Sequence, residues 1–184
     1  MYRVLLVDDE AGILSALRRV LASIPPSDLD GERLEVVTCQ DPEEALQKFE
    51  EEAFDLVISD YRMPGRSGVE MLVEMAQRQP QVARILLTGY ADLEGIIGAL
   101  NEARVYRFIP KPWNDYELRF AVRQALSIRA MQLENQRLAD LVRQQHGMLS
   151  RQEAELRRLE SEHPGITRIQ RDESGAIFID EDDL

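Results

Sequence analysis

Short apolar runs alternate with amphipathic segments over roughly the first 125 residues of the chain. Each run is rich in Val, Ile and Leu and ends at turn-forming or acidic residues, which is typical of strands buried on both faces. In the segments between the runs, apolar residues recur every three or four positions, which predicts helices. Strands are expected at residues 3–7, 34–39, 54–60, 82–88 and 106–112, and helices at 13–21, 42–52, 69–80, 91–101 and from 115 onward.

This alternation indicates an α/β fold. Short crossovers between strands produce parallel pairing and place helices on both faces, so the pattern predicts a five-stranded, parallel, doubly wound sheet. The Asp41-Pro42 step supports one boundary, because an acid caps a helix and proline suits the first helical position. Asn114 or Asp115 is expected to cap the last helix. Residues 1–125 are interpreted as one domain.

The last predicted helix continues far beyond this domain, since no proline interrupts the chain from Asp115 to about Glu162. Seven of its ten a and d heptad positions are apolar, which is the pattern of a coiled-coil seam. The a positions are Ile128, Asn135, Val142, Leu149 and Leu156, and the d positions are Met131, Leu138, Gln145, Gln152 and Leu159.

Asparagine at one a position, with Ile and Val at others, favours a parallel two-stranded coil. Residues 116–163 are therefore predicted to form a homodimer. A solvated single helix, or one packed back on the domain, is the alternative, because Gly147 and the two glutamines at d weaken the seam.

Residues 164–184 are predicted to form a β-hairpin-like tail with an acidic end. Two segments with strand-forming residues, 166–171 and 176–179, flank a polar turn at 172–175. A lone hairpin is marginal in water, so this one is expected to pair across a dimer or with another protein. No DNA-reading helix and no enzyme motif is recognised after residue 125.

Composition excludes several classes of protein. The net charge of −12 argues against a nucleic-acid surface, which needs clustered Lys and Arg. No run of 18 apolar residues is present, so no membrane insertion is expected and a cytoplasmic location is predicted. The single cysteine, Cys39, is interpreted as a small core residue, and His146 and His163 as surface residues.

Polar residues with chemical potential follow four of the five predicted strands: Asp8 and Asp9, Asp60, Thr88, and Lys111. The carboxyl ends of parallel strands meet at one edge of a sheet, so these side chains are expected to gather there. Three close carboxylates repel one another unless a cation lies among them, and an all-oxygen set suits Mg²⁺. Lys111 is one of only two lysines in the chain, and its compact ammonium suits a phosphoryl oxygen.

Adjacent acids after the first strand, Asp after the third, Thr after the fourth and Lys-Pro after the fifth together resemble the receiver domain of bacterial response regulators. The resemblance covers about residues 2–125 and implies a flavodoxin-like fold. It also implies that Asp60 accepts a phosphoryl group from a sensor histidine kinase or phosphotransfer protein. The residues it assigns to Mg²⁺ are Asp9, Asp60 and the backbone carbonyl of Arg62, with Asp8 acting through water.

The same resemblance assigns Thr88 and Lys111 to the phosphoryl oxygens. It makes Thr88 and Phe108 the switch pair, in which the aromatic ring turns inward as Thr88 moves. Lys111-Pro112-Trp113 is similar to a subgroup of receivers that feed cyclic-diguanylate phosphodiesterases. Such an enzyme would be a partner, because its signature residues are absent from this chain.

The sequence thus predicts a phosphorylation-activated response regulator that signals by protein contact through a dimeric coiled coil and tail, without DNA-binding output. No enzyme activity is expected beyond self-catalysed transfer onto Asp60 and its hydrolysis. A DNA-binding regulator is one alternative. A Mg²⁺-dependent phosphohydrolase is another, although such enzymes usually carry a second acid where this chain has Arg62. A scaffold that no longer transfers phosphate is the third.

Overall fold

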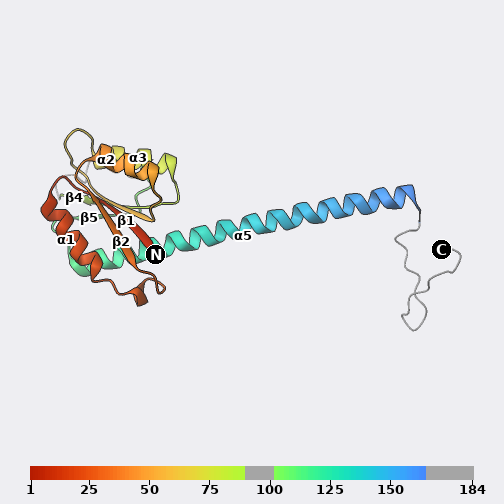
Figure 1. Cartoon of the computed structure of the whole chain (residues 1–184), viewed down its shortest axis with the longest axis horizontal. Coiled ribbons are helices and arrows are strands. Elements are labelled where there is room, and N and C mark those ends of the chain that lie inside the picture. Colours follow the sequence, from red (N-terminus) through yellow and green to blue (C-terminus); the bar gives the residue numbers. More distant parts are fainter. Residues whose placement is uncertain (90–101, 165–184) are drawn as a thin grey trace. The chain divides into compact units, whose positions relative to one another are not determined.

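The computed structural model describes residues 1–89 and 102–164. Its elements are β1 (Tyr2–Val7), α1 (Ala11–Ala22), a short 3₁₀ turn η1 (Pro26–Asp28), β2 (Leu34–Cys39), α2 (Pro42–Glu51), β3 (Leu56–Asp60), α3 (Gly68–Arg78), β4 (Ala83–Thr88), β5 (Arg107–Pro110) and α5 (Asp115–Glu162) (Figure 1). The helix predicted at 91–101 and the hairpin predicted in the tail lie outside the described residues.

The described strands form one parallel five-stranded sheet in the order β2-β1-β3-β4-β5, which confirms the predicted fold class. Every residue of β3 is buried, as expected for a central strand with both faces covered. The strand order reverses direction between β1 and β3. In an open α/β sheet, this switch point at the carboxyl edge is where ligands bind.

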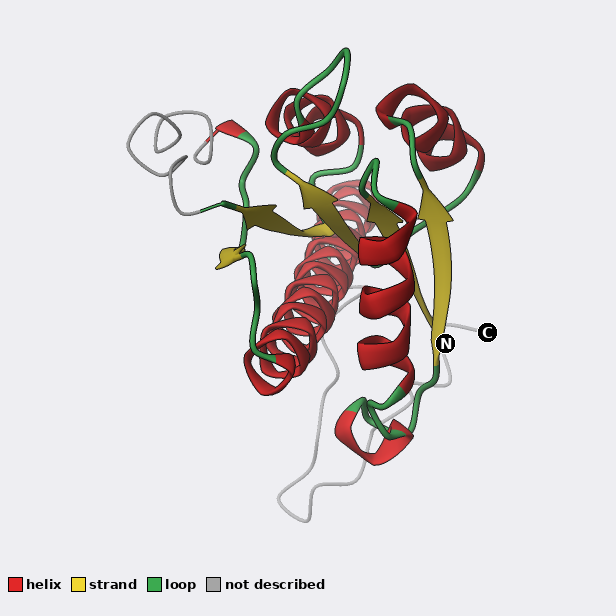
Figure 2. Ribbon diagram, turned by 90° about the vertical axis from the view of Figure 1, so that its left-hand side faces the viewer, coloured by secondary structure: helices red, strands yellow, loops and turns green. Residues whose placement is uncertain are grey.

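Two apolar cores lie on the two faces of the sheet. Figure 2 shows helices on both sides of the strands. Successive strand residues point to opposite faces, so Leu56 and Ile58 join one core while Val57 joins the other. The first core is completed by α1 and the first turns of α5, and the second by α2 and α3. A three-layer arrangement follows, and it explains why the strands are almost continuously apolar.

Side-chain caps fix the beginnings of α2, α3 and α5, and Ser67 provides the one on α3. The carboxylate of Asp41 accepts hydrogen bonds from the backbone N–H groups of Glu43 and Glu44, at 2.8 and 3.0 Å, as predicted for α2. Asn114, rather than Asp115, caps α5, because its side-chain oxygen accepts from the N–H of Tyr116 at 2.9 Å. These caps satisfy donors that have no partner inside the helix.

A charged side chain, Arg84, lies inside the otherwise apolar strand β4. It is 3% exposed and donates hydrogen bonds to the carbonyl oxygens of Gln79, Pro80 and Ala103. Gln79 and Pro80 directly follow α3, so the guanidinium lies near the negative end of that helix, where a cation is favourable. Burial lowers the pKa of Arg84 to about 10, so its guanidinium stays charged at neutral pH.

Helix α5 is continuous from Asp115 to Glu162, within a residue of the expected end. Its buried residues all fall between Leu118 and Leu126, and this part belongs to a compact unit that ends at Glu134. From Asn135 onward the described side chains are almost all exposed. In the described part of the chain, no helix combines the length and apolarity needed to cross a membrane.

The interpretations of Cys39, His146 and His163 are confirmed. Cys39 is buried and burial raises the pKa of its thiol, which suits a core residue. His146 and His163 are exposed. Trp113 is partly buried and packs against the core that contains α1 and α5.

Candidate functional site

Five of the predicted site residues lie at the carboxyl edge of the sheet, where backbone hydrogen bonds fix the chain: Asp8, Asp9, Asp60, Thr88 and Lys111. The pairing of the strands continues one residue past several strand ends: the N–H of Asp8 donates to the carbonyl of Cys39, and the N–H of Lys111 to that of Thr88 at 2.7 Å. Asp60 is itself the last residue of β3 and pairs with Leu87. The sheet therefore fixes each backbone before any side chain contributes.

Three carboxylates converge at this edge. Asp8, Asp9 and Asp60 each offer an oxygen atom, and these atoms lie within 4.8 Å of one another. Asp8 is fully buried and Asp60 is 8% exposed, whereas Asp9 is exposed. Like charges so close, with little water around two of them, repel strongly unless a cation compensates them.

Lys111 provides part of that compensation. Its Nζ lies 2.7 Å from an oxygen of Asp8 and 2.7 Å from an oxygen of Asp60, so one ammonium bridges two carboxylates. Burial lowers the pKa of Lys111, but the hydrogen bonds to Asp60 and Asp8 outweigh it, and the net shift is upward. Lys111 is thus a firmly protonated cation.

The environment acts on Asp60 in the opposite sense. Burial raises the pKa of its carboxyl above the usual value, even though Lys111 acts to lower it. Burial therefore destabilises the carboxylate form of Asp60 relative to its protonated form. An additional cation at the site would stabilise the carboxylate.

The donor set fits Mg²⁺. Carboxylate oxygens are the ligands this hard cation prefers, and an exposed member such as Asp9 leaves room for the water molecules that it keeps. The three acids and the single ammonium leave the cluster with a negative charge that a divalent ion would offset. The part of Arg62 in such a site stays a prediction; this residue lies in the loop after β3, with its guanidinium near the ring of Tyr61.

The two residues of the predicted switch differ in position and in surroundings: Thr88 is the last residue of β4, whereas Phe108 is the second residue of β5 and pairs with Leu86. Thr88 is 1% exposed, and its hydroxyl donates to the carbonyl of Gly89 at 3.0 Å. Phe108 is 46% exposed, so its ring faces outward in this structure. Their roles in switching stay predictions.

One residue that the sequence analysis missed is Gly68, the first residue of α3. A Cβ atom at this position would lie 1.8 Å from the backbone oxygen of Asp60, so only glycine allows α3 to approach so closely. The N–H of Gly68 donates to the carbonyl of Tyr61 at 2.9 Å, which closes the loop after β3. The only sequence signal was a glycine at a helix start after a proline-containing loop.

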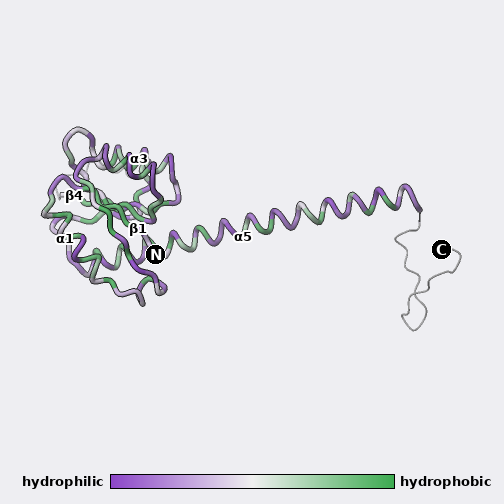
Figure 3. Tube along the Cα trace, viewed as in Figure 1, coloured by the Kyte–Doolittle hydropathy of each residue, from purple (hydrophilic) through white to green (hydrophobic). Residues whose placement is uncertain are grey.

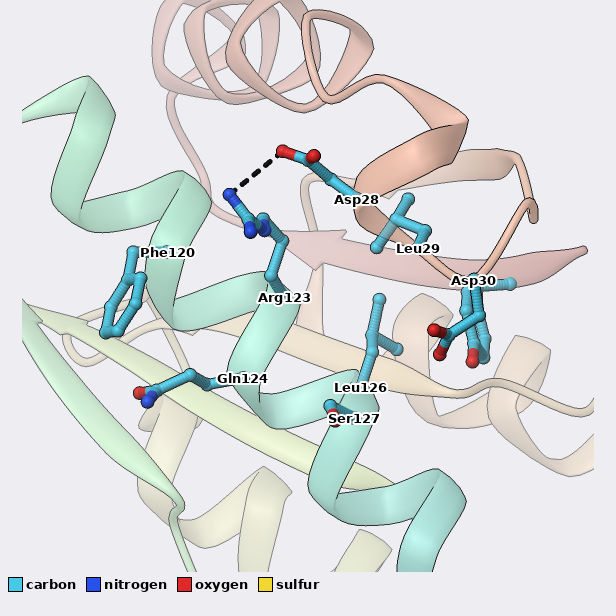
Figure 4. A pocket seen from close by; sticks show the side chains of 9 residues that line it. Asp28, Leu29, Asp30, Phe120, Arg123, Gln124, Leu126 and Ser127 are labelled. Atoms are coloured by element: carbon cyan, nitrogen blue, oxygen red, sulfur yellow. Dashed lines mark ion pairs between the residues drawn. The ribbon is translucent and has the colours of Figure 1, made fainter.

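A cavity of about 230 Å³ lies away from these acids, between the start of β1, the η1 region and α5 (Figure 4). One wall carries an ion pair between Arg123 and Asp28 at 2.9 Å. None of the predicted site residues lines it; the lining residues are Tyr2, Asp28, Leu29, Asp30, Phe120, Arg123, Gln124, Leu126 and Ser127.

A doubly wound sheet with three acids, a buried threonine and a bridging lysine at its switch point defines a class of protein, the receiver domains of two-component signalling. Residues 4–123 match the family model of the response regulator receiver domain, and the chain belongs to this family.

The chain is similar to several transcriptional regulators. It is 38% identical over 135 residues to the hydrogenase transcriptional regulatory protein HoxA of Cupriavidus necator, which covers 73% of this chain and 26% of the relative. It is 34% identical to the C4-dicarboxylate transport transcriptional regulatory protein DctD of Pseudomonas aeruginosa over 92% of this chain and 36% of the relative. The chain thus spans only about a quarter to a third of these relatives.

Solved receiver structures resemble it over most of their own length. The signal receiver domain of an HD domain-containing protein from Pseudomonas fluorescens Pf-5 is 37% identical with a TM-score of 0.64, covering 72% of this chain and 92% of that one. A response regulator receiver domain protein from Clostridium thermocellum is 32% identical with a TM-score of 0.61, covering 71% and 98% respectively. These matches confirm the predicted family.

Proposed function

We propose that this chain is a phosphorylation-activated response regulator that accepts a phosphoryl group on Asp60 from a sensor histidine kinase or phosphotransfer protein. The observation that carries the proposal is the Lys111 ammonium bridging Asp8 and Asp60 within a cluster of three carboxylates. A purely structural ion pair would balance one acid with one base. This cluster keeps excess negative charge around a carboxylate at the ligand-binding edge of the sheet.

In the proposed reaction a carboxylate oxygen of Asp60 attacks phosphorus, the bond from phosphorus to the donor nitrogen breaks, and the leaving imidazole takes up a proton. Asp9, Asp60 and the Arg62 carbonyl would hold Mg²⁺, with Asp8 supporting it through water. The ion supplies positive charge to the phosphoryl oxygens as the group is transferred. Lys111 and Thr88 would bind those oxygens by an ammonium and a hydroxyl, so positioning and electrostatics accomplish the step.

No further enzyme activity is proposed. A Mg²⁺-dependent phosphohydrolase would need a second acid to protonate or activate its substrate. In this chain the residue two positions after Asp60 is Arg62, which cannot take that role because its guanidinium stays protonated. Slow hydrolysis of the phosphorylated Asp60 would return the protein to its resting state.

The proposed output is protein contact through a homodimer formed by residues 116–163. The seam positions Met131, Leu138 and Leu149 are 63%, 50% and 55% exposed, which suits side chains that a second helix covers. A cyclic-diguanylate enzyme is one proposed downstream target. The support for this target is the similarity of the chain to the receiver of an HD domain-containing protein from Pseudomonas fluorescens.

DNA-binding output is the second candidate, because relatives such as NtrC of Escherichia coli are named DNA-binding transcriptional regulators. The net charge of −12 favours protein contact instead. A gel-shift measurement at several salt concentrations separates the two. Binding of the chain to DNA with a steep salt dependence would favour the second candidate.

The central experiment is labelling of the full chain with acetyl phosphate, with Mg²⁺ or with EDTA. We expect a Mg²⁺-dependent label that hydroxylamine removes, since hydroxylamine cleaves acyl phosphates. A chain that takes up no such label would overturn the proposal. The dimer is tested by solution mass with and without beryllofluoride: a monomer in both conditions would overturn that part alone.

A further inference from the structure

The middle of α5 carries an apolar stripe wider than a two-stranded seam requires. Besides the a and d positions, Leu141 and Met148 occupy g positions and are 49% and 65% exposed. Figure 3 shows apolar stretches recurring along α5 between polar ones. In a two-stranded coil the a and d residues are covered by the partner helix, while g residues lie at the border of the seam. Leu141 and Met148 would keep much of their exposure there.

The charges around the same stripe are segregated. From residue 153 to 162 every e and g position is glutamate, whereas Arg151, Arg157 and Arg158 fall on the outward b and c positions. Arg158 forms ion pairs with two glutamates at g positions, with Glu155 at 2.7 Å and with Glu162 at 3.7 Å. One positive charge therefore neutralises only part of the charge of these two acids. The border of the seam is therefore acidic overall in its last two turns.

In a parallel dimer the g residues of one helix face the e residues of its partner, so each side of the coil presents one shallow groove. Such a groove would have Leu141 and Met148 in its middle and glutamates toward its carboxyl-terminal end. The two-fold symmetry of the dimer would produce two identical grooves.

We propose that each groove binds an amphipathic helix of a partner protein, with an apolar face for Leu141 and Met148 and lysines or arginines at one end for the glutamates. The inference rests on the proposed dimer. In the parallel dimer Glu155 of one helix already faces Glu160 of the other, so the border of each groove carries uncompensated acids. A further copy of α5 would add more glutamates to this border, which is unfavourable, whereas a basic helix end would neutralise it. A polar partner without an apolar face would leave Leu141 and Met148 uncovered.

Binding is tested with the full chain and a synthetic amphipathic peptide that has leucines on one face and lysines in its last two turns. A second peptide carries glutamates in place of the lysines. Fluorescence anisotropy measures peptide binding, and analytical ultracentrifugation measures the mass of the chain in the same buffer. We expect a dimer that binds the lysine peptide at least about tenfold more tightly than the glutamate peptide, the size expected for several charge contacts.

The position of the peptide-binding site on the chain is tested by two variants with the same net charge. One variant changes four acids of the coil to glutamine, and its control changes four exposed acids of α2, so both alter the net charge equally. The coil set is Glu153, Glu155, Glu160 and Glu162, and the α2 set is Glu43, Glu44, Glu50 and Glu51. We expect about tenfold weaker binding for the coil variant and little change for the α2 variant.

The apolar part has its own pair of variants. Leu141→Ala with Met148→Ala should weaken binding by about tenfold, while Gln144→Ala with Arg151→Ala, which lie at outward positions, should not. A wild-type chain that is monomeric overturns the proposed dimer and the groove with it. A dimer that binds both peptides equally, or that the α2 and coil variants weaken equally, overturns the groove and leaves the dimer standing.

Discussion

The two ends of strand β3 each hold an aspartate against a cation from a distant part of the chain. At the carboxyl end, Asp60 lies 2.7 Å from Lys111. Just before the amino end, Asp55 lies 2.6 Å from Arg129 of α5. The two contacts are similar in length and in burial, but their surroundings differ.

At Asp55 the charges balance. One carboxylate faces one guanidinium, and its second oxygen accepts the backbone N–H of Arg3 at 2.6 Å. At Asp60 the single ammonium of Lys111 serves a cluster of three acids. An ion pair therefore stabilises the fold at the amino end of β3, while at the carboxyl end an uncompensated negative charge is retained. Folding is not improved by that excess, but binding of a divalent cation is.

Substitution of the two aspartates should differ most in its effect on phosphorylation. Asp60→Asn should abolish the acetyl phosphate label, because an amide oxygen is a poor nucleophile. Asp55→Asn removes the same charge from the other end of the same strand and should leave the label almost intact. The measurement is incorporation of the label with Mg²⁺ for both variants. Retention of the label in Asp60→Asn, or its loss in both variants, would break the distinction.

The second prediction concerns the packing of α3 against the backbone of Asp60. Gly68→Ala places a Cβ against the Asp60 carbonyl, so α3 or the end of β3 must shift, at a cost of about 3 kcal/mol or more in unfolding free energy. Gly12→Ala is the control, because nothing lies within 4 Å of a Cβ there, and Ala stabilises a helix by about 0.5–1 kcal/mol. Urea denaturation measures both. Equal stabilities for the two variants would contradict the close packing at Gly68.

The site was largely predictable from sequence, because each of its side chains directly follows or ends a strand and parallel strands end at one edge. Asp8, Asp60, Thr88 and Lys111 needed no long-range information beyond that. The opposite end of β3 was not predictable, since nothing in the local sequence of Asp55 points to a residue of α5. The burial of Arg84 was not predicted for a related reason. Its carbonyl partners, such as those of Gln79 and Ala103, belong to other segments of the chain, and the local sequence of β4 does not indicate them.

The third prediction concerns the ion pair between Asp55 and Arg129 at the amino end of β3. Asp55→Asn, Arg129→Gln and the double variant form a thermodynamic cycle, and we expect a coupling free energy of about 1–2 kcal/mol for this largely buried pair. Asp55→Asn should cost more than Arg129→Gln, because Asp55 also accepts the N–H of Arg3, whereas the Nε of Arg129 has no hydrogen-bond partner among the described residues. Additive single changes would show that the contact contributes nothing.

The fourth prediction concerns the excess negative charge of the cluster formed by Asp8, Asp9 and Asp60. Lys111→Met leaves the three carboxylates without their ammonium, so the variant should be less stable than wild type in EDTA and should gain more from Mg²⁺. We expect the Mg²⁺-induced rise in Tm to exceed that of wild type by about 3–5 °C, which corresponds to about 1 kcal/mol. Arg129→Gln is the control and should show the wild-type rise. An unchanged rise in Lys111→Met would mean that the ion does not bind at this cluster.

The smallest effect is a pH dependence of stability at Asp60. Burial raises the pKa of Asp60 in the folded protein above the ordinary value of 3.8, so the folded state holds the proton to higher pH than the unfolded state. Stability therefore falls as pH rises from 3.8 through the folded-state pKa, and the cost of the charge is fully present at neutral pH. In EDTA, Asp60→Asn should unfold at a higher temperature than wild type at pH 7, and this advantage should vanish below pH 3.8. Asp55→Asn should instead be less stable than wild type at pH 7, because that carboxylate is compensated. If both variants lost stability at pH 7, Asp60 would be a structural acid like Asp55, and the contrast between the two ends of β3 would disappear.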